Sequence, residues 1–484
     1  MAQTIAAAES TAATTTSASR LEAPRTITGA TDAEVDTIRG LWAVWAARLP
    51  RNLLRSTYYD GEAPLKDLGI AIPPTFQRFR VVIGWPEKTV RALAARNIFD
   101  GFVAAGDDQD PFDLGGLLDE NRFTVELPQA IVSAYKHSCA FVSTTLGDVA
   151  SGEPEVLVMP RSAETSAALW DRNRRALSAA LAITDTDKDG RPIGLIAYLP
   201  DVVLLCVKGG GGWLADRLPN PLGVVPVEPL TYDPQLDRPF GRSRITRAVM
   251  DITDRAARTV LRTEVSAEFY ASPQRYILGA DEEAWAGTDK WRAVMGRFLA
   301  LTRDENGDLP QVGQFAQATM QPHLEMLRSL AAQFAGETGL PLASLGVVSD
   351  NPSSAEAIYA AKEDLVVEAL ASNRNLGWSV DRIARRTVML RDSLDAPTSE
   401  LRALRTRWAN PAFPSPVTAS DALVKNATVF PWLGESDVAL ERAGFSESEI
   451  TRLAETRRRA NGAALIAGLG AAAAAPAAVV PVVS

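Results

Sequence analysis

The feature that most constrains the fold of this chain is a block of short β-prone runs between Cys139 and about Leu230. Gly, Pro and Asp turns separate the runs "AFVSTTLG", "PEVLVMP", "ALSAALAIT", "PIGLIAYLP" and "DVVLLCVK", a pattern that favours an antiparallel sheet. The flanking sequence has helical periodicity, and 484 residues exceed the usual size of one core. We therefore expect an α+β protein, mainly α, built from several subdomains.

A long amphipathic helix is expected after this block, over about Ser243 to Tyr270. At about 100° per residue, five arginines fall within a sector of roughly 80°, away from the apolar residues Ile245 and Val249. The sequence leaves two interpretations open: a solvated face with local ion pairs, or a stripe that meets acidic residues on a neighbouring copy of the chain. The stripe consists of Arg244, Arg247, Arg255, Arg258 and Arg262.

A polar loop leads into a second long helix at "SDNPSSAEAIYAAKEDL". Ser353 and Glu356 have the spacing of a capping box, which sets the start of the helix. We expect the helix to run for about 40 residues, with Gly377 as its kink or break. Val347 and Val348, before the loop, are expected to be exposed. A loop before a kinked helix suggests a moving part, although a plain helix–loop–helix has the same signature.

Charge and rare residues restrict the function further. The formal net charge of −9 and the isoelectric point near 5.1 argue against a protein held to nucleic acid by phosphate neutralisation. They do not exclude a surface past which DNA slides. The two cysteines, Cys139 and Cys206, lie in apolar runs and are expected to be small buried hydrophobes, which favours synthesis in a reducing compartment.

Three short motifs fail as chemical sites. The glycines of "KGGGGW" are not followed by the helix and Lys-Ser/Thr pair of a phosphate-binding loop, so a strand connection is expected. His137 and Cys139 would lie on different faces of a helix. "DTDKDG" starts like a calcium loop, but position twelve is an isoleucine, so we expect a β-hairpin turn at Asp185, Asp187 and Asp189. We expect no catalytic residue, metal or cofactor.

The two ends of the sequence differ from the rest. Residues 1–26 are rich in Ala, Ser and Thr and lack the basic start of a secretory signal, so a disordered arm is expected. Residues 463–484 carry no charge, but they are mostly Ala and Gly, and Pro476 and Pro481 would interrupt a helix. A flexible tail is favoured over a membrane anchor.

Four segments, in this order, resemble the portal (head–tail connector) proteins of long-tailed phages, especially the siphophage type found in phages of actinobacteria. They are "LRSTYYDGEAPL", "FGRSRITRAVMDITDRAARTVLRTEVSAEFYASPQRYILG", "HLEMLRSLAAQFAGETGLPLASLG" with "NPSSAEAIYAAKEDL", and "DALVKNATVFPWLGESDVALERAGFSESEITRLAETRRRA". No single piece is diagnostic, and the resemblance rests on their order and spacing over about residues 32–460.

The resemblance implies a portal fold with wing, stem, clip and crown regions. After the arm at 1–26, the expected parts are the wing (27–240), first stem helix (241–271), clip (272–317), second stem helix (318–339), tunnel loop (340–354), long kinked helix with wing return (355–400), crown helices (401–462) and Ala-rich tail (463–484).

The resemblance also implies residue roles. The tunnel loop would include Gly346, Val347, Val348, Ser349, Asp350, Asn351 and Pro352. The channel helix would present Ser353, Glu356, Lys362, Glu363 and Asp364, and the clip would present Asp281, Glu282, Glu283, Arg303 and Asp304. Carboxylates at the lumen would repel DNA phosphate, so that DNA is confined without being held.

The implied assembly is a homo-oligomer, a dodecamer, around double-stranded DNA at one capsid vertex of the virion. Its partners would be the major capsid protein, the terminase large subunit and the head–tail adaptor, with synthesis in the host cytoplasm and no membrane. Two alternatives stay open: a metal-dependent hydrolase using the aspartates of "DTDKDG", and a scaffold anchored in a membrane by residues 463–483.

Overall fold

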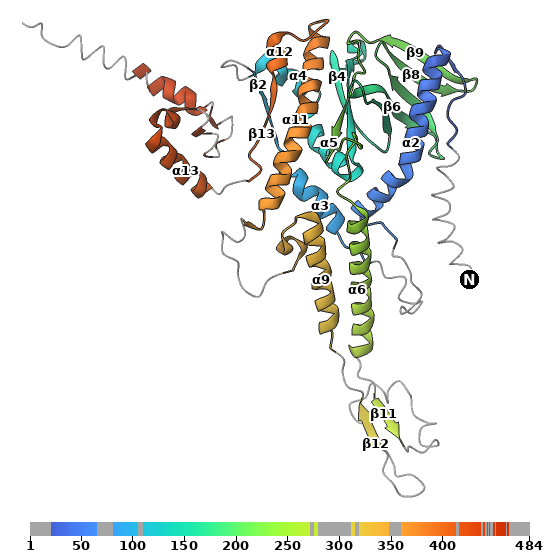
Figure 1. Cartoon of the computed structure of the whole chain (residues 1–484), viewed down its shortest axis with the longest axis vertical. Helices are drawn as coiled ribbons and strands as arrows, with labels where there is room; N and C mark the ends of the chain where they lie inside the picture. Colours follow the sequence, from blue (N-terminus) through green and yellow to red (C-terminus); the bar gives the residue numbers. More distant parts are fainter. Residues whose placement is uncertain are drawn as a thin grey trace, which may run out of the picture. The chain divides into compact units, whose positions relative to one another are not determined.

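The computed structural model of the chain describes residues 21–64, 81–104, 110–271, 275–278, 311–314, 319–347, 360–412, 416–436 and parts of 439–463. Helices and sheets both occur, as expected for an α+β protein (Figure 1). The chain divides into two compact units, Met1–Pro411 and Ala412–Ser484.

Two sheets make up the β-rich part of the first unit. The larger has the order β1 (Ile27–Thr28), β9 (Gly212–Pro219), β8 (Val202–Gly209), β7 (Pro192–Tyr198), β6 (Ala176–Thr186) and β5 (Ser166–Asp171). The smaller has the order β10 (Val227–Thr231), β3 (Cys139–Leu146) and β4 (Val156–Ser162). Every pair in both sheets is antiparallel except β1 with β9, so the expected antiparallel region is confirmed.

Helix α2 (Asp32–Tyr59) covers one face of the larger sheet. Thr31 and Glu34 form a capping box that sets its start. Trp42 and Trp45 are buried against the sheet, and the indole of Trp45 donates a hydrogen bond of 2.7 Å to the carbonyl oxygen of Glu164. The other face of this sheet packs on the smaller sheet through a second apolar cluster that includes the buried Cys139.

A helical core adjoins the smaller sheet. It combines residues of α3 (Trp85–Ala94), α4 (Leu114–Glu120), α5 (Phe123–His137), α6 (Arg247–Ala271), α9 (Gln321–Thr338) and α11 (Glu363–Arg391). The pair β13 (Arg405–Trp408) and β2 (Phe99–Val103) packs on α11, and the short helix α12 (Ser399–Ala403) precedes it. The described residues of this unit also form the 3₁₀ helices η2 (Pro111–Asp113), η3 (Val149–Ser151) and η4 (Leu342–Leu345).

Helices α6 and α9 lie side by side (Figure 1). The first begins at Arg247, a few residues later than expected, and the second ends at Gly339 in a left-handed conformation. Between them in the sequence, β11 (Arg275–Leu278) pairs antiparallel with β12 (Gln311–Gln314). All five expected clip residues, Asp281, Glu282, Glu283, Arg303 and Asp304, lie outside the described residues.

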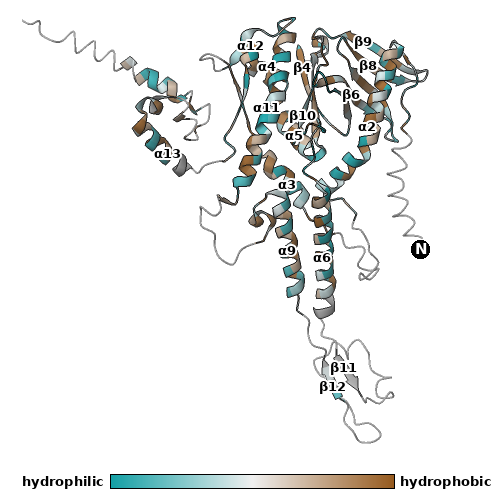
Figure 2. Ribbon diagram, viewed as in Figure 1, coloured by the Kyte–Doolittle hydropathy of each residue, from teal (hydrophilic) through white to brown (hydrophobic). Residues whose placement is uncertain are grey.

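The break expected at Gly377 is wrong, because α11 continues through this residue to Arg391. A Cβ atom at Gly377 would lie 3.1 Å from the indole nitrogen of Trp408, so the glycine makes room for a neighbouring ring. The described helix begins at Glu363, after a turn at 361–362. Teal and brown alternate along it in Figure 2, as expected for a helix with a polar and an apolar side.

Two of the motifs rejected from the sequence, "DTDKDG" and "KGGGGW", are turns in the structure. The expectation that His137 and Cys139 share a helix is wrong, because α5 ends at His137 and β3 begins at Cys139. The carboxylate of Asp187 accepts backbone hydrogen bonds from Asp189 and Arg191 at 2.9 and 2.8 Å, which closes the β6–β7 turn. The glycines of "KGGGGW" join β8 to β9. Within the described ranges no group of three or more His, Cys, Asp or Glu side chains could hold a metal ion. No described helix is long and apolar enough to cross a membrane.

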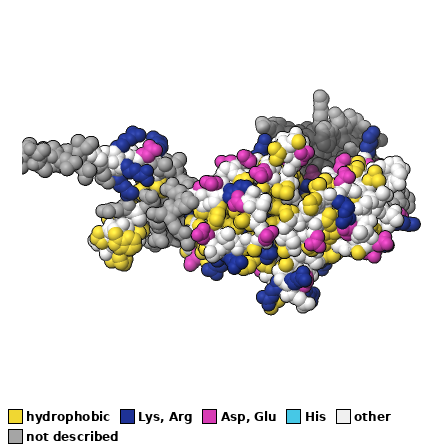
Figure 3. All heavy atoms as spheres, turned by 90° about the horizontal axis from the view of Figure 1, so that it is seen from above, with side chains coloured by type: hydrophobic (Ala, Val, Ile, Leu, Met, Phe, Trp, Pro, Cys, Tyr) yellow, Lys and Arg dark blue, Asp and Glu magenta, His cyan; other side chains and the backbone are white. Residues whose placement is uncertain are grey.

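The second unit contains α13 (Pro416–Val429) and the 3₁₀ helix η5 (Pro431–Glu435). Exposed hydrophobic side chains gather on this unit (Figure 3), among them Val424, Val429, Phe430 and Trp432. The boundary after Pro411 divides the expected crown segment, because 401–411 belongs to the first unit.

Candidate functional site at the junction of α6, α9 and α11

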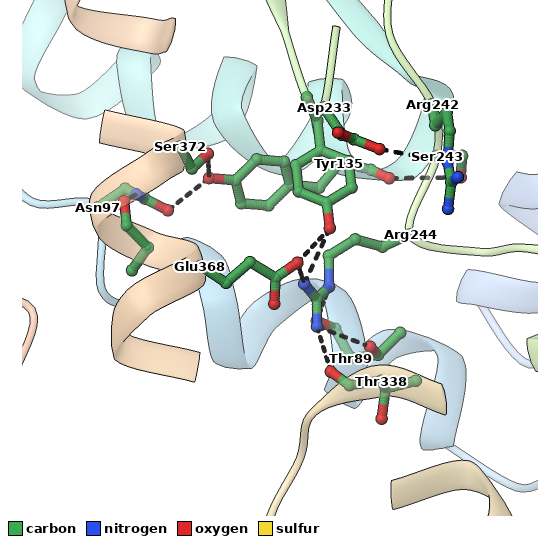
Figure 4. A network of polar contacts seen from close by, with 12 residues as sticks. Thr89, Asn97, Tyr135, Asp233, Arg242, Ser243, Arg244, Thr338, Glu368 and Ser372 are labelled. Atoms are coloured by element: carbon green, nitrogen blue, oxygen red, sulfur yellow. Dashed lines mark hydrogen bonds and ion pairs between the residues drawn. The ribbon is translucent and has the colours of Figure 1, made fainter. Parts of the chain in front are cut away.

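The guanidinium group of Arg244 lies at the centre of a buried polar network (Figure 4). Only 6% of this residue is exposed. Its Nε donates to the carbonyl oxygen of Thr89 at 2.9 Å, and its Nη2 donates to the carbonyl oxygen of Thr338 at 2.8 Å. Its Nη1 donates to a carboxylate oxygen of Glu368, forming an ion pair. One side chain therefore connects α3, the last residue of α9 and α11.

The electrostatics of this network keep Arg244 charged. Burial alone would lower the pKa of Arg244, but Tyr232 and Glu368 together raise it above its ordinary value. The hydroxyl of Tyr232, 3.2 Å from Nη1 of Arg244, also donates to Glu368. Burial raises the pKa of Tyr232, so this hydroxyl stays protonated. Arg244 and Tyr232 therefore both act as donors to the side chain of Glu368.

A second layer of hydrogen bonds extends the network to α5. The ring of Tyr135 packs against the ring of Tyr232, with centroids 4.9 Å apart. Its hydroxyl donates to the side-chain oxygen of Asn97 at 2.6 Å and lies 2.5 Å from the hydroxyl of Ser372 on α11. The amide of Asn97 donates in turn to Asn373 at 2.6 Å. Helix α11 is thus attached along two of its turns.

The C-terminal half of α11 is attached to β10 by a buried ionic cluster. The carboxylate of Glu228 accepts from Arg382 at 2.9 Å and from Arg386 at 2.5 Å. The hydroxyl of Ser379 donates to the carbonyl oxygen of Pro229 at 2.8 Å. The half of α11 nearer the junction and the half nearer the sheet therefore have separate anchors.

The described ends of the expected tunnel loop lie next to this junction in the chain. After α9 ends, the chain forms η4, where Leu345 is buried. Gly346 is exposed, and Val347 packs partly buried against the helical core, so the expectation of an exposed Val347 is wrong. On the other side Lys362 precedes α11. Val348, Ser349, Asp350, Asn351, Pro352, Ser353 and Glu356 lie outside the described residues.

The expected arginine stripe is only partly correct. Arg244 precedes α6 and points into the junction, because its backbone N–H donates to the carbonyl oxygen of Tyr135 and its side chain pairs with Glu368. The other four lie on α6 and reach the surface: Arg247, Arg255, Arg258 and Arg262. Arg255 lies 3.9 Å from Asp251 and 3.4 Å from the side-chain oxygen of Gln333 on α9.

Sequence reasoning missed the partners of Arg244, because Glu368, Tyr232 and Thr338 are far apart in the chain. One local signal was available in Gly241. This glycine has φ +70°, and a Cβ there would lie 2.0 Å from the carbonyl oxygen of Tyr232. Such a position requires glycine and marks a tight approach three residues before Arg244.

Comparisons with known proteins identify the family of this chain. The family model described as phage portal protein, SPP1 Gp6-like, matches residues 39–429. The portal protein of Mycobacterium phage L5 is 28% identical over 428 residues, covering 86% of this chain and 86% of that protein. The portal protein of Mycobacterium phage D29 is 28% identical over 388 residues, covering 78% and 79%.

Solved structures of a gene transfer agent (GTA) particle are more distant. A chain of its native virion has a TM-score of 0.41 at 16% identity, covering 79% of this chain and 94% of that chain. A chain of the neck of the empty particle, computed with C6 symmetry, has a TM-score of 0.44 at 13% identity, covering 78% and 89%. The family match and the two mycobacteriophage relatives confirm the resemblance seen in the sequence. The chain belongs to the SPP1 Gp6-like family of phage portal proteins, which are structural proteins and not enzymes.

Proposed function

We propose that the chain assembles into a closed ring of twelve copies at one vertex of the phage head, and that double-stranded DNA passes through the ring during packaging and ejection. The observation that carries this proposal is the junction at Arg244. It joins the paired helices α6 and α9 to α11 at the two chain ends that bracket residues 348–359. A loop that borders moving DNA needs such a fixed base.

The proposed regions follow the order of the chain. Residues 27–240 would form the wing that contacts the major capsid protein, and α6 and α9 would form the stem. Residues 272–317 would form the clip, where the terminase large subunit docks during packaging and the head–tail adaptor docks afterwards. Residues 401–462 would form the crown, with 401–411 attached to the wing side of the chain.

The part of the proposed channel surface that the structure describes is acidic. Glu363 and Asp364 lie exposed in the first turn of α11, directly after the loop segment. Carboxylates there would repel phosphate and keep DNA from binding tightly. The residues proposed to complete the tunnel loop and channel helix are Gly346, Val347, Val348, Ser349, Asp350, Asn351, Pro352, Ser353, Glu356 and Lys362.

The mass and shape of the purified full-length chain test this proposal. Twelve copies of a 51.9 kDa chain give a closed cyclic assembly of about 620 kDa. Multi-angle light scattering is expected to return this mass, and negative-stain microscopy is expected to show rings with a central hole. Rings with a neighbouring number of subunits would still support a channel. A compact particle of the single-chain mass under all conditions would contradict it.

A further inference from the structure

A small cavity lies between the two sheets of the first unit. Its volume is about 10 Å³, close to the least that one water molecule needs. The smaller sheet contributes Ser143 of β3 and Arg161 of β4 to its wall. The larger sheet contributes Ser166 of β5, with Ala180 and Ala182 of β6. The cavity therefore adjoins strands of both sheets.

Strand register explains why space is left at this place. Ser166 lies opposite Ala182 in the β5–β6 pair, and Ala180 lies two residues before Ala182 on the same face of β6. All three side chains are short and buried. Side chains of this size do not reach across to the smaller sheet, so the gap between the sheets is not filled by carbon atoms.

Two polar atoms at the cavity have no hydrogen-bond partner within the described part of the chain. They are the Nε of Arg161 and the Oγ of Ser166, and both atoms are buried. Ser166 is only 4% exposed. Leaving a buried donor or acceptor without a partner destabilises a fold, and ordered water commonly supplies that partner.

Ser143 shows which kind of molecule fits these atoms. Its hydroxyl donates to the carbonyl oxygen of Met159 at 3.3 Å, so its remaining lone pairs can only accept. The Nε of Arg161 can only donate, whereas the hydroxyl of Ser166 can do either. A molecule that satisfies all three must donate on one side and accept on another. Water does both, but a halide ion only accepts.

We propose that one water molecule binds in this cavity as a fixed part of the fold. It accepts a hydrogen bond from the Nε of Arg161, donates to the Oγ of Ser143 and shares a hydrogen bond with the Oγ of Ser166. The water thereby joins β3, β4 and β5 inside the mainly apolar cluster between the sheets. This inference concerns a single copy of the chain and does not depend on the proposed ring.

Density for the water tests the inference directly. The full chain is crystallised, or imaged as an assembled particle by cryo-electron microscopy, at a resolution that shows ordered waters elsewhere in the core. One peak within about 3.2 Å of both the Nε of Arg161 and the Oγ of Ser166 is expected. No peak here, with other buried waters visible, would overturn the inference. An anomalous bromine peak in the cavity, in crystals grown with bromide in place of chloride, would show an anion and would also overturn it.

Filling the cavity gives a second measurement that does not depend on density. Ala180→Val adds two methyl groups to a side chain of the cavity wall and should displace the water. Arg161 and Ser166 then lose their partner, so the equilibrium constant for unfolding in urea should rise about tenfold or more. A variant more stable than the wild type would show that the cavity is dry and would contradict the proposal.

The variant Arg161→Met separates the loss of water from crowding by the valine. Methionine places its terminal methyl group where arginine has Nε, so the occupied space is similar but the buried donor is gone. Ala180→Val should therefore raise the unfolding constant by a smaller factor in the Arg161→Met background than in the wild type. Equal factors in the two backgrounds would mean that the valine acts by crowding alone, and the water site would be abandoned.

Discussion

The ion pair at the junction is asymmetric. The side chain of Arg244 is 3% exposed, whereas that of Glu368 is 29% exposed. A carboxylate left alone can still be hydrated, but a guanidinium left alone at this depth cannot. Removing one partner of a buried pair is costly mainly because of the charge that remains. The two residues should therefore respond differently to substitution.

The substitution Glu368→Gln tests this asymmetry. It keeps the shape of the side chain but leaves Arg244 without a counter-charge, which should lower the free energy of unfolding by about 3 kcal/mol. Urea unfolding followed by tryptophan fluorescence measures the change. Glu120→Gln, at an exposed position with no ion pair to a described residue, is the control and should change it by less than about 0.5 kcal/mol. Equal midpoints for the two variants would contradict a structural role of the pair.

A second residue-scale prediction concerns pH. Arg217 donates to both carboxylate oxygens of Glu34, at 2.6 and 2.9 Å, and this hydrogen bonding lowers the pKa of Glu34 from 4.5 to about 2. The contribution to stability is therefore complete above pH 4.5 and is lost as the pH falls toward 2. The difference in melting temperature between the wild type and Glu34→Gln should be constant from pH 7 to pH 5 and should shrink below that.

The control for this measurement is Glu62→Gln, an exposed carboxyl outside the ion pair. Thermal melts across the same pH series should show the narrowing difference for Glu34→Gln only. A difference for Glu34→Gln that stays constant down to pH 3 would mean that the ion pair does not form.

At the scale of elements, a substitution of Gly377 tests whether this glycine is a hinge of α11 or makes room for the ring of Trp408. A hinge glycine would tolerate Gly377→Val, because valine is the better helix former. A glycine that makes room for Trp408 would not, and overpacking should lower the free energy of unfolding by about 1–3 kcal/mol. Ala43→Val, exposed on α2, reports the cost of valine in a helix without crowding. A stability of Gly377→Val equal to the wild type would restore the hinge interpretation.

The sequence predicted helices and strands better than the contacts between them. The β-prone runs and the helices α6 and α9 follow from local periodicity and turn residues, so they could be predicted. The break at Gly377 could not be judged, because the reason for that glycine is Trp408, which lies 31 residues later in the sequence. Arg244 was placed on the helix face by periodicity, although its partners come from α3, α9 and α11. Contacts distant in sequence leave no periodic signal.

At the scale of the whole molecule, a single chain leaves several apolar surfaces exposed to solvent. Large apolar side chains are exposed on α11, on α2 and in the second unit, among them Trp378, Leu54 and Trp432. Apolar patches of this kind mark interaction sites in soluble proteins. A portal protein that works as a ring would cover such surfaces with neighbouring copies. The four arginines on α6 form a further charged surface, on which Arg255 already pairs with Asp251 of the same chain.

The last prediction concerns this arginine face. If it meets carboxylates on a neighbouring copy, Arg255→Glu with Arg258→Glu places like charges together and should shift the light-scattering mass from rings toward smaller species. The lost pair with Asp251 is exposed and should contribute little by itself. Arg172→Glu with Arg174→Glu, at the exposed β5–β6 turn, changes the net charge equally and should leave the mass unchanged. Assembly of the wild type should also weaken with salt, because screening at 1 M reduces the range of such contacts to about 3 Å. Rings that withstand both the double substitution and salt would assign the arginine face to solvent.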